Sequence, residues 1–167
     1  MVRILAVLAA IAFAVPAFAQ PLPANLDKAN AIVIDTTKGR VIIKLRTDLA
    51  PKHAERIKQL ARDGYYNNVP FHRVIEGFMA QTGDGSKFNG TGGSKYPNLQ
   101  AEFTNTPFKR GTVGMARASD PNSANSQFFI CFGDASFLNG KYTVVGEVVS
   151  GMDVVDKIKR GGPVQNP

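Results

Sequence analysis

The apolar residues of this chain occur in short runs separated by turn residues, and this spacing limits what the chain can fold into. Runs rich in β-branched and aromatic residues predict β-strands, and Thr36-Thr37-Lys38-Gly39 predicts a hairpin between the first two. The predicted strands cover 31–35, 40–45, two segments about Gly77 within 70–82, 111–116, 127–132 and 142–149. Short strands with turns between them, and no internal repeat, favour a single antiparallel sheet that closes into a barrel.

Two helices are predicted beside these strands. Ala50-Pro51 is a helix start, an apolar stripe recurs at helical spacing through the segment that follows, and Gly64 ends it, so the first helix covers 51–63. A second, short helix is expected over 153–159. The chain is therefore predicted to be mainly β, a closed antiparallel barrel capped by two α-helices in one domain over 30–162. A flexible lead-in over 20–29 precedes the domain, and a C-terminal tail over 163–167 follows it.

The first 19 residues have the pattern of a cleavable signal peptide. A short basic start precedes the apolar run 4–15, and Ala17-Phe18-Ala19 is the small-x-small pattern that signal peptidases accept, which places cleavage before Gln20. The alternative is a retained N-terminal anchor, but the run is shorter than the about twenty residues that span a membrane. We expect export to a bacterial periplasm without stable membrane insertion.

Composition excludes several classes of function. Cys131 is the only cysteine, so no internal disulfide forms, and one cysteine with two unclustered histidines argues against a structural metal site. The net charge of +7 comes from scattered Lys and Arg without a basic run, which favours solubility or attraction to anionic surfaces over nucleic-acid binding. The Gly-rich segment 83–95 fits neither a P-loop nor a dinucleotide fingerprint and is expected to be a long surface loop.

Arg73 is the most informative single residue, because it places a permanent cation within the strand-like segment 71–81. A guanidinium keeps its charge and is rarely buried without a partner. Three explanations follow: Arg73 is paired with a carboxylate, it extends to water, or it is presented at a site. Glu76, three residues later, is the carboxylate whose pairing with Arg73 the sequence leaves open.

Apolar residues from several segments would form a pocket with Arg73 as one of its few polar members, together with Gln81 or Gln127. These apolar residues are Phe78, Met79, Phe129, Phe137 and Leu138. An apolar concavity with few polar groups is typical of a small-molecule or peptide-side-chain site. Ordinary core packing explains each aromatic taken singly.

Together these segments resemble the cyclophilins, the peptidyl-prolyl cis/trans isomerases. The resemblance covers about 31–161, and four motifs in the same order carry it: 71–75, 77–81, 126–130 and 145–153. It implies an eight-stranded antiparallel barrel with two capping helices, no cofactor, proline-containing polypeptides as substrates and a monomeric state. Weak binding of cyclosporin-type ligands is also implied, since Phe137 stands where many members carry Trp.

The resemblance also implies roles for individual residues. Arg73 matches the catalytic arginine, Gln81 and Gln127 match groups that bind the substrate backbone, and Ala116 and Ala118 match small residues beside the residue that precedes proline. Phe78, Met79, Phe129 and Leu138 match the pocket for the proline ring. The remaining substrate-binding candidates depart from the family pattern, and these are Arg117, Phe137 and Tyr142.

Three functions compete at this point. The first is an isomerase that accelerates rotation of X-Pro bonds in exported proteins and so assists folding. The second is a binding module or chaperone that uses the same groove without catalysis. The third, a hydrolase built on Ser126, lacks a nucleophile elbow around that residue. His72 is assigned to structure, because neighbouring residues of a strand point to opposite faces and Arg73 is expected to face the pocket.

Overall fold

One curved antiparallel sheet forms the frame of the protein. The structure, a computed structural model, describes residues 21–161, so the predicted signal peptide and C-terminal tail lie outside the described residues. The strands are β1 (Ala31–Thr36), β2 (Gly39–Leu45), β3 (Arg73–Ile75), β4 (Met79–Thr82), β5 (Thr112–Met115), β6 (Phe128–Cys131) and β7 (Val144–Ser150). The helices are α1 (Pro51–Arg62) and α2 (Met152–Asp156), with single 3-10 turns at η2 (Lys28–Asn30) and η3 (Ser136–Leu138).

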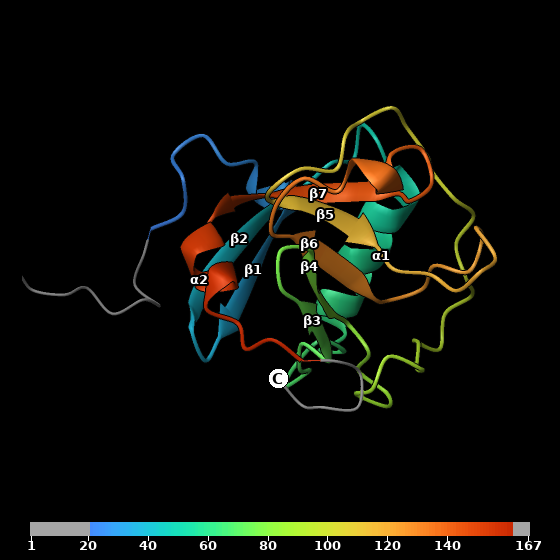
Figure 1. The fold of residues 1–167 in the computed structure, drawn as a ribbon, viewed down its shortest axis with the longest axis horizontal. Coiled ribbons are helices and arrows are strands. Elements are labelled where there is room, and N and C mark those ends of the chain that lie inside the picture. The colour runs from blue at the N-terminus through green and yellow to red at the C-terminus, as the bar shows by residue number, and fades with distance from the viewer. Residues whose placement is uncertain (1–20, 162–167) are drawn as a thin grey trace, which may run out of the picture.

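The sheet follows the order β1-β2-β7-β5-β6-β4-β3, and every pairing is antiparallel. In Figure 1 the sheet curls, with α2 beside β1 and β2 and α1 on the other side. The mainly β class, the predicted hairpin at 36–39 and the presence of two helices are confirmed, although α2 ends at Asp156 and not at 159. Among the described residues, no helix is long and apolar enough to cross a membrane.

The expected closed, eight-stranded barrel is wrong in two respects: seven strands form within 21–161, and the sheet is an open half-barrel whose edges are β1 and β3. The stretch that precedes β5 contains Pro97 and Pro107, which have no N–H to donate to a ladder. It forms one isolated bridge, between Leu99 and Ala124. At the other edge, Gly161 adds only a single bridge to Val74.

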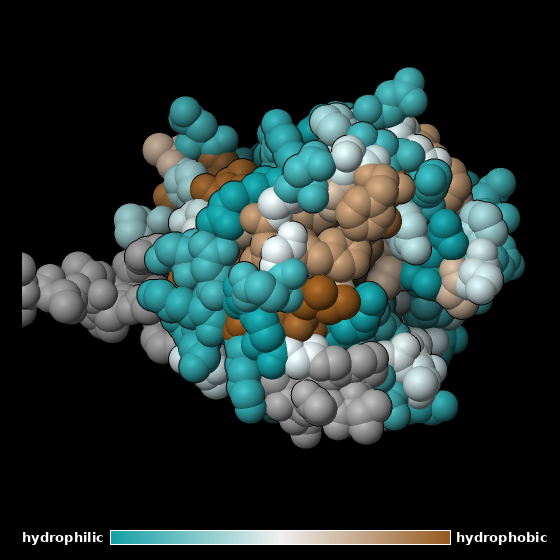
Figure 2. Space-filling view, viewed as in Figure 1, coloured by the Kyte–Doolittle hydropathy of each residue, from teal (hydrophilic) through white to brown (hydrophobic). Residues whose placement is uncertain are grey.

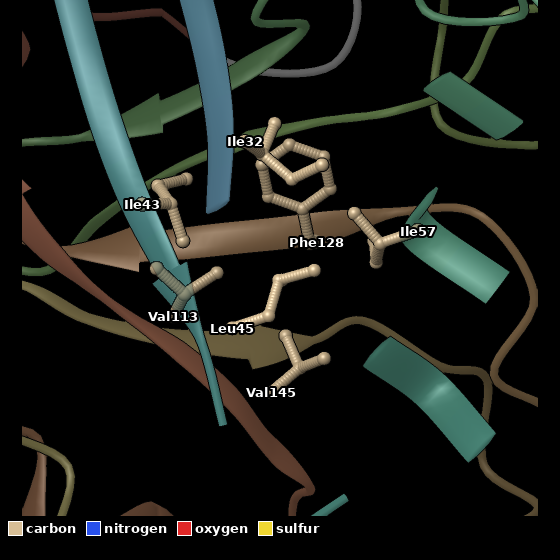
Figure 3. A pocket seen from close by; sticks show the side chains of 7 residues that line it. All are labelled: Ile32, Ile43, Leu45, Ile57, Val113, Phe128 and Val145. Atoms are coloured by element: carbon tan, nitrogen blue, oxygen red, sulfur yellow. The ribbon is translucent and has the colours of Figure 1, made fainter. Parts of the chain in front are cut away.

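The inner face of the sheet is filled by the main core. Seven apolar side chains from five strands and α1 converge there around a void of about 10 Å³ (Figure 3), and these are Ile32, Ile43, Leu45, Ile57, Val113, Phe128 and Val145. The void offers no polar partner, and its volume is at the lower limit for one water molecule. The interior of the curved sheet is therefore packed core and not a ligand cavity.

The outer face of β4 and β6 carries a second apolar cluster, which follows from the two-residue period of a strand. Phe128 and Ile130 belong to the main core, whereas Phe129 and Cys131 belong to the second cluster. The run 127–132, which the sequence predicts as one strand, thus contributes side chains to the main core on one face and to the second cluster on the other. The second cluster positions the candidate site.

Candidate functional site

Strand register brings Arg73, Gln81 and Phe129 onto one face of the sheet. Arg73 on β3 lies opposite Gln81 on β4, and Gln81 lies opposite Phe129 on β6. Directly opposed residues of an antiparallel pair point to the same side. A cation, an amide and an aromatic ring that are distant in sequence therefore lie side by side on the outer face.

Arg73 has no carboxylate partner among residues 21–161. Its Nη1 donates a hydrogen bond to Gln81 Oε1 at 3.3 Å. Glu76 instead pairs with Arg160, whose Nε lies 2.6 Å from Glu76 Oε2. The pairing of Glu76 with Arg73 that the sequence left open is therefore absent, and the half-buried guanidinium of Arg73 keeps donors free.

The apolar pocket candidates lie together next to this arginine. Met79, Phe129 and Leu138 are buried members of the second cluster, and Phe78 is half-buried against it. Phe137 on η3 is 61% exposed and its ring packs against Phe78, with centroids 5.3 Å apart. Figure 2 shows apolar surface gathered near the middle of one face with hydrophilic side chains around it.

Phe108 supports this pocket and was not among the predicted site residues. It is fully buried, and its ring stacks on Phe129 with centroids 5.8 Å apart. A third ring, Tyr142, meets Phe129 edge-on at 6.0 Å. Phe129 also lies over Gly114, where a Cβ would meet both Phe108 and Phe129. In the sequence, Phe108 stands alone between Pro107 and two basic residues, and this was the only signal for its supporting role.

Gln81 and Gln127 form a hydrogen-bonded pair behind Arg73. Gln81 Nε2 donates to Gln127 Oε1 at 2.9 Å. Gln127 Nε2 donates to the backbone carbonyls of Gly90 and Gly92, at 2.9 Å and 2.8 Å. The two predicted backbone-binding amides therefore lie together and connect the arginine to the Gly-rich loop.

A groove of about 360 Å³ lies beside the second apolar cluster. Predicted and unpredicted residues line it, namely Gln81, Gly90, Thr91, Gly92, Gly93, Asn98, Ala116, Arg117, Ala118, Ser123, Asn125, Ser126 and Gln127. Ala116 also packs against the second cluster, so the groove and the pocket share this wall. The groove was missed in part because its lining comes from five separate stretches of the sequence, namely 81, 90–93, 98, 116–118 and 123–127.

The guanidinium of Arg117 donates its hydrogen bonds mainly to backbone carbonyls of the protein itself. Its Nη1 donates to the carbonyls of Ala118 and Ser119, and its Nη2 donates to the carbonyl of Lys141 at 2.8 Å. Its guanidinium also lies over the Tyr142 ring, 4.4 Å from the centroid. Arg117 thus joins the loop after β5 to the loop before β7, and it is the only charged side chain that lines the groove within the described part of the chain.

The loop 83–93 is organised around the buried carboxylate of Asp84. Five backbone N–H groups donate to its two oxygens, from Ser86, Lys87, Asn89, Gly90 and Gly92. Burial alone would raise the pKa of this carboxyl, but the backbone donors outweigh burial and lower the pKa far below its usual range. The predicted long loop is therefore confirmed, and it is ordered around one anion.

The other titratable and nucleophilic candidates have structural surroundings. His72 is buried beside Gly90, where an added Cβ would come within 2.9 Å of its Nε2, and burial lowers its pKa. The Cys131 thiol is buried and its pKa is raised by desolvation to about 12. Ser126 Oγ donates to the carbonyl of Gly83 at 2.7 Å, and within residues 21–161 it has no hydrogen bond to a histidine. Residues 21–161 contain no cluster of three metal-ligating side chains.

The model of one protein family, described as cyclophilin type peptidyl-prolyl cis-trans isomerase/CLD, matches residues 31–167. A Brucella suis protein named probable peptidyl-prolyl cis-trans isomerase is 59% identical over 150 residues, covering 84% of this chain and 76% of that protein. Peptidyl-prolyl cis-trans isomerase B of Escherichia coli is 40% identical over 146 residues, covering 77% of this chain and 83% of that protein.

Solved structures show the same fold. A cyclophilin from Hirschia baltica has a TM-score of 0.78 and 29% identity, covering 85% of this chain and 72% of that one. A cyclophilin type peptidyl-prolyl cis-trans isomerase from Cryptosporidium parvum, solved in the presence of the dipeptide Ala-Pro, has a TM-score of 0.74 and 30% identity. That comparison covers 81% of this chain and 92% of the other.

Proposed function

The chain belongs to the cyclophilin-type peptidyl-prolyl cis-trans isomerases, and on this premise we propose that it isomerises X-Pro bonds of exported proteins with Arg73 as the catalytic residue. The observation that carries the proposal is the half-buried Arg73, which has no carboxylate partner in the described chain and whose strand register places it on the same face as Phe129 of the second apolar cluster. We further propose that this activity assists the folding of clients in a bacterial periplasm.

The reaction breaks no covalent bond and needs neither a nucleophile nor a base. Its barrier, about 18–20 kcal/mol, comes from delocalisation of the nitrogen lone pair into the carbonyl. Uncatalysed X-Pro exchange takes tens of seconds or longer. An enzyme lowers this barrier by holding the proline ring, letting the carbonyl turn, and stabilising the twisted amide more than either planar isomer.

The proline ring has no donor, so an apolar surface suffices to hold it. We assign this role to the pocket of Phe78, Met79, Phe129 and Leu138, with Phe137 at its rim. Three of these side chains are buried within the second cluster before any substrate arrives, so little ordering is needed on binding.

Arg73 supplies a donor where the amide twists. Its guanidinium cannot deprotonate, and its planar fork holds several N–H donors in fixed directions. Because Gln81 occupies only one of these donors, the others can serve the substrate nitrogen or the turning carbonyl. The contribution is on the order of a few kcal/mol if the donor is used only in the twisted state.

The groove beside the pocket is assigned to the residues that precede proline. Ala116 and Ala118 leave room for a backbone, Gln81 and Gln127 provide amides, and Arg117 with Tyr142 forms the wall between the groove and the pocket. We also propose that the protein acts as a monomer. Cyclosporin-type ligands are expected to bind weakly, because the Phe137 ring covers less area than the Trp found in many members.

The test is the rate of X-Pro exchange in a short peptide, measured with wild type and Arg73→Ala. We expect kcat/KM to fall roughly 10²-fold, the usual cost of losing one preorganised donor. Arg40→Ala is the matched control, because it removes the same charge from an exposed Arg40–Asp35 pair in the β1–β2 hairpin. Equal rates for wild type and Arg73→Ala would refute the role of Arg73. Peptide binding without any acceleration by wild type would favour the binding module.

Export is tested separately. The whole chain is expressed in a Gram-negative host, and the N-terminus of the protein from the periplasmic fraction is sequenced. A start at Gln20 supports cleavage after Ala19, whereas full-length protein retained with the membranes would support an uncleaved anchor.

A further inference from the structure

A one-way chain of hydrogen bonds leads from the Gly-rich loop to Arg73. Gln127 Nε2 donates to the carbonyls of Gly90 and Gly92, and only an NH₂ group can satisfy two carbonyls. Gln127 must therefore turn its oxygen toward Gln81, which donates to it. The Gln81 oxygen is then left facing Arg73 Nη1, which donates to it. Each amide has a single orientation that satisfies its neighbours.

The two carbonyls that set this orientation are held by Asp84. The N–H groups of Gly90 and Gly92 donate to Asp84 Oδ2, at 2.9 Å and 3.0 Å. Each of these two glycines therefore binds Asp84 through its N–H group and Gln127 through its carbonyl group. Asp84 is fully buried, and its second oxygen accepts from Ser86 and Lys87. Asp84 itself does not line the groove.

We propose that Asp84 is a positioning residue for Arg73, acting through the loop carbonyls of Gly90 and Gly92 and the amides of Gln127 and Gln81. This inference rests on the proposed catalytic role of Arg73. Within residues 21–161 the guanidinium has no other hydrogen-bond or ion-pair partner, so the bond to Gln81 is the contact that restricts where its free donors point. Because a displacement of about 1 Å from productive geometry can cost on the order of 10²-fold in rate, this restriction has catalytic value.

The substitution Asp84→Asn tests the proposal, since its amide has one acceptor oxygen where the carboxylate has two. We expect kcat to fall roughly tenfold while KM changes less than about twofold, because the apolar pocket is untouched. The matched control is Asp120→Asn, which changes the same functional group in an exposed turn, where the Asp120 carboxylate accepts one hydrogen bond within the described chain, from the Asn122 N–H. This control should retain the wild-type kcat.

A spectroscopic measurement distinguishes an effect of Asp84 on the position of Arg73 from an effect on the shape of the loop alone. The Nε–Hε resonance of Arg73 in the folded, substrate-free protein should shift in Asp84→Asn and stay in place in Asp120→Asn. An increase in KM alone, with kcat and the Arg73 resonance unchanged, would mean that the loop only shapes the groove, and would overturn the proposal.

Gln127→Met provides a second route if Asp84→Asn does not fold. It keeps the size of the side chain and removes both of its hydrogen-bonding functions, so it should shift the Arg73 resonance in the same way. An unmoved resonance in this variant refutes the relay. The resonance does not depend on catalysis, so a wild type that fails to accelerate exchange would refute the proposed function while the relay is still tested.

Discussion

Gly114 is the position where the structure makes the sharpest quantitative prediction. Its backbone does not lie in the left-handed region, so alanine is allowed there and the outcome depends on packing alone. An added Cβ would meet Phe129 and would come within 2.6 Å of the Phe108 ring, which is closer than Cβ atoms approach in real proteins. Neither ring has space to retreat, since Phe108 is 0% and Phe129 is 4% exposed.

We therefore expect Gly114→Ala to be overpacked. Forcing one methyl into a close-packed core costs typically 1–3 kcal/mol, or about 2–12 °C in melting temperature for a domain of this size. The same change presses on Phe129, which is part of the proposed proline pocket, so KM for an X-Pro peptide should rise as well. Chemical denaturation and the peptide exchange assay measure the two effects.

Gly133→Ala is the matched control, because a Cβ at Gly133 has only one neighbour, the Gly77 carbonyl at 4.0 Å. Replacing glycine by alanine at a compatible position stabilises the folded protein by about 0.4–1 kcal/mol, because it reduces the conformational entropy of the unfolded chain. Both variants share that gain. If Gly114→Ala were as stable as Gly133→Ala and kept its KM, the packing of the two rings on Gly114 would be refuted.

Two further predictions concern charge. Because Glu76 pairs with Arg160 and not with Arg73, Glu76→Gln should leave kcat/KM within about twofold, and should change stability by less than about 1 kcal/mol, as exposed ion pairs do. A large gain or loss of activity would show that Glu76 acts on Arg73. Burial lowers the pKa of both His53 and His72, so the folded protein binds fewer protons than the unfolded chain below the ordinary histidine value of about 6.5. The free energy of unfolding should therefore be at its full value above this pH and should decrease from pH 7.5 to pH 5.5 in urea titrations. His72→Gln should weaken this dependence, and an unchanged slope would contradict the assignment to His72.

Local sequence patterns were sufficient to predict most elements of this protein. β-branched and aromatic runs predicted the strands, the hairpin at 36–39 formed as expected, and Pro51 begins α1. These features depend on neighbours within a few residues, where propensity and periodicity are strong.

The closure of the sheet could not be predicted in the same way. Strand number depends on whether distant edges find partners, and the edges β1 and β3 are separated by the whole width of the sheet. The eighth strand was implied by resemblance and was not carried by a strand pattern of its own. Within 21–161 the candidate stretches form only isolated bridges.

The sequence by itself determined which residues were available for the site, through the motifs around Arg73 and Gln127. Tertiary structure alone decided their partners. It paired Glu76 with Arg160, placed Phe108 beneath Phe129, and linked Gln127 to the loop held by Asp84. Each of these contacts joins residues that are at least twenty positions apart along the chain or belong to a loop without periodicity, so only the folded chain brings them within bonding distance.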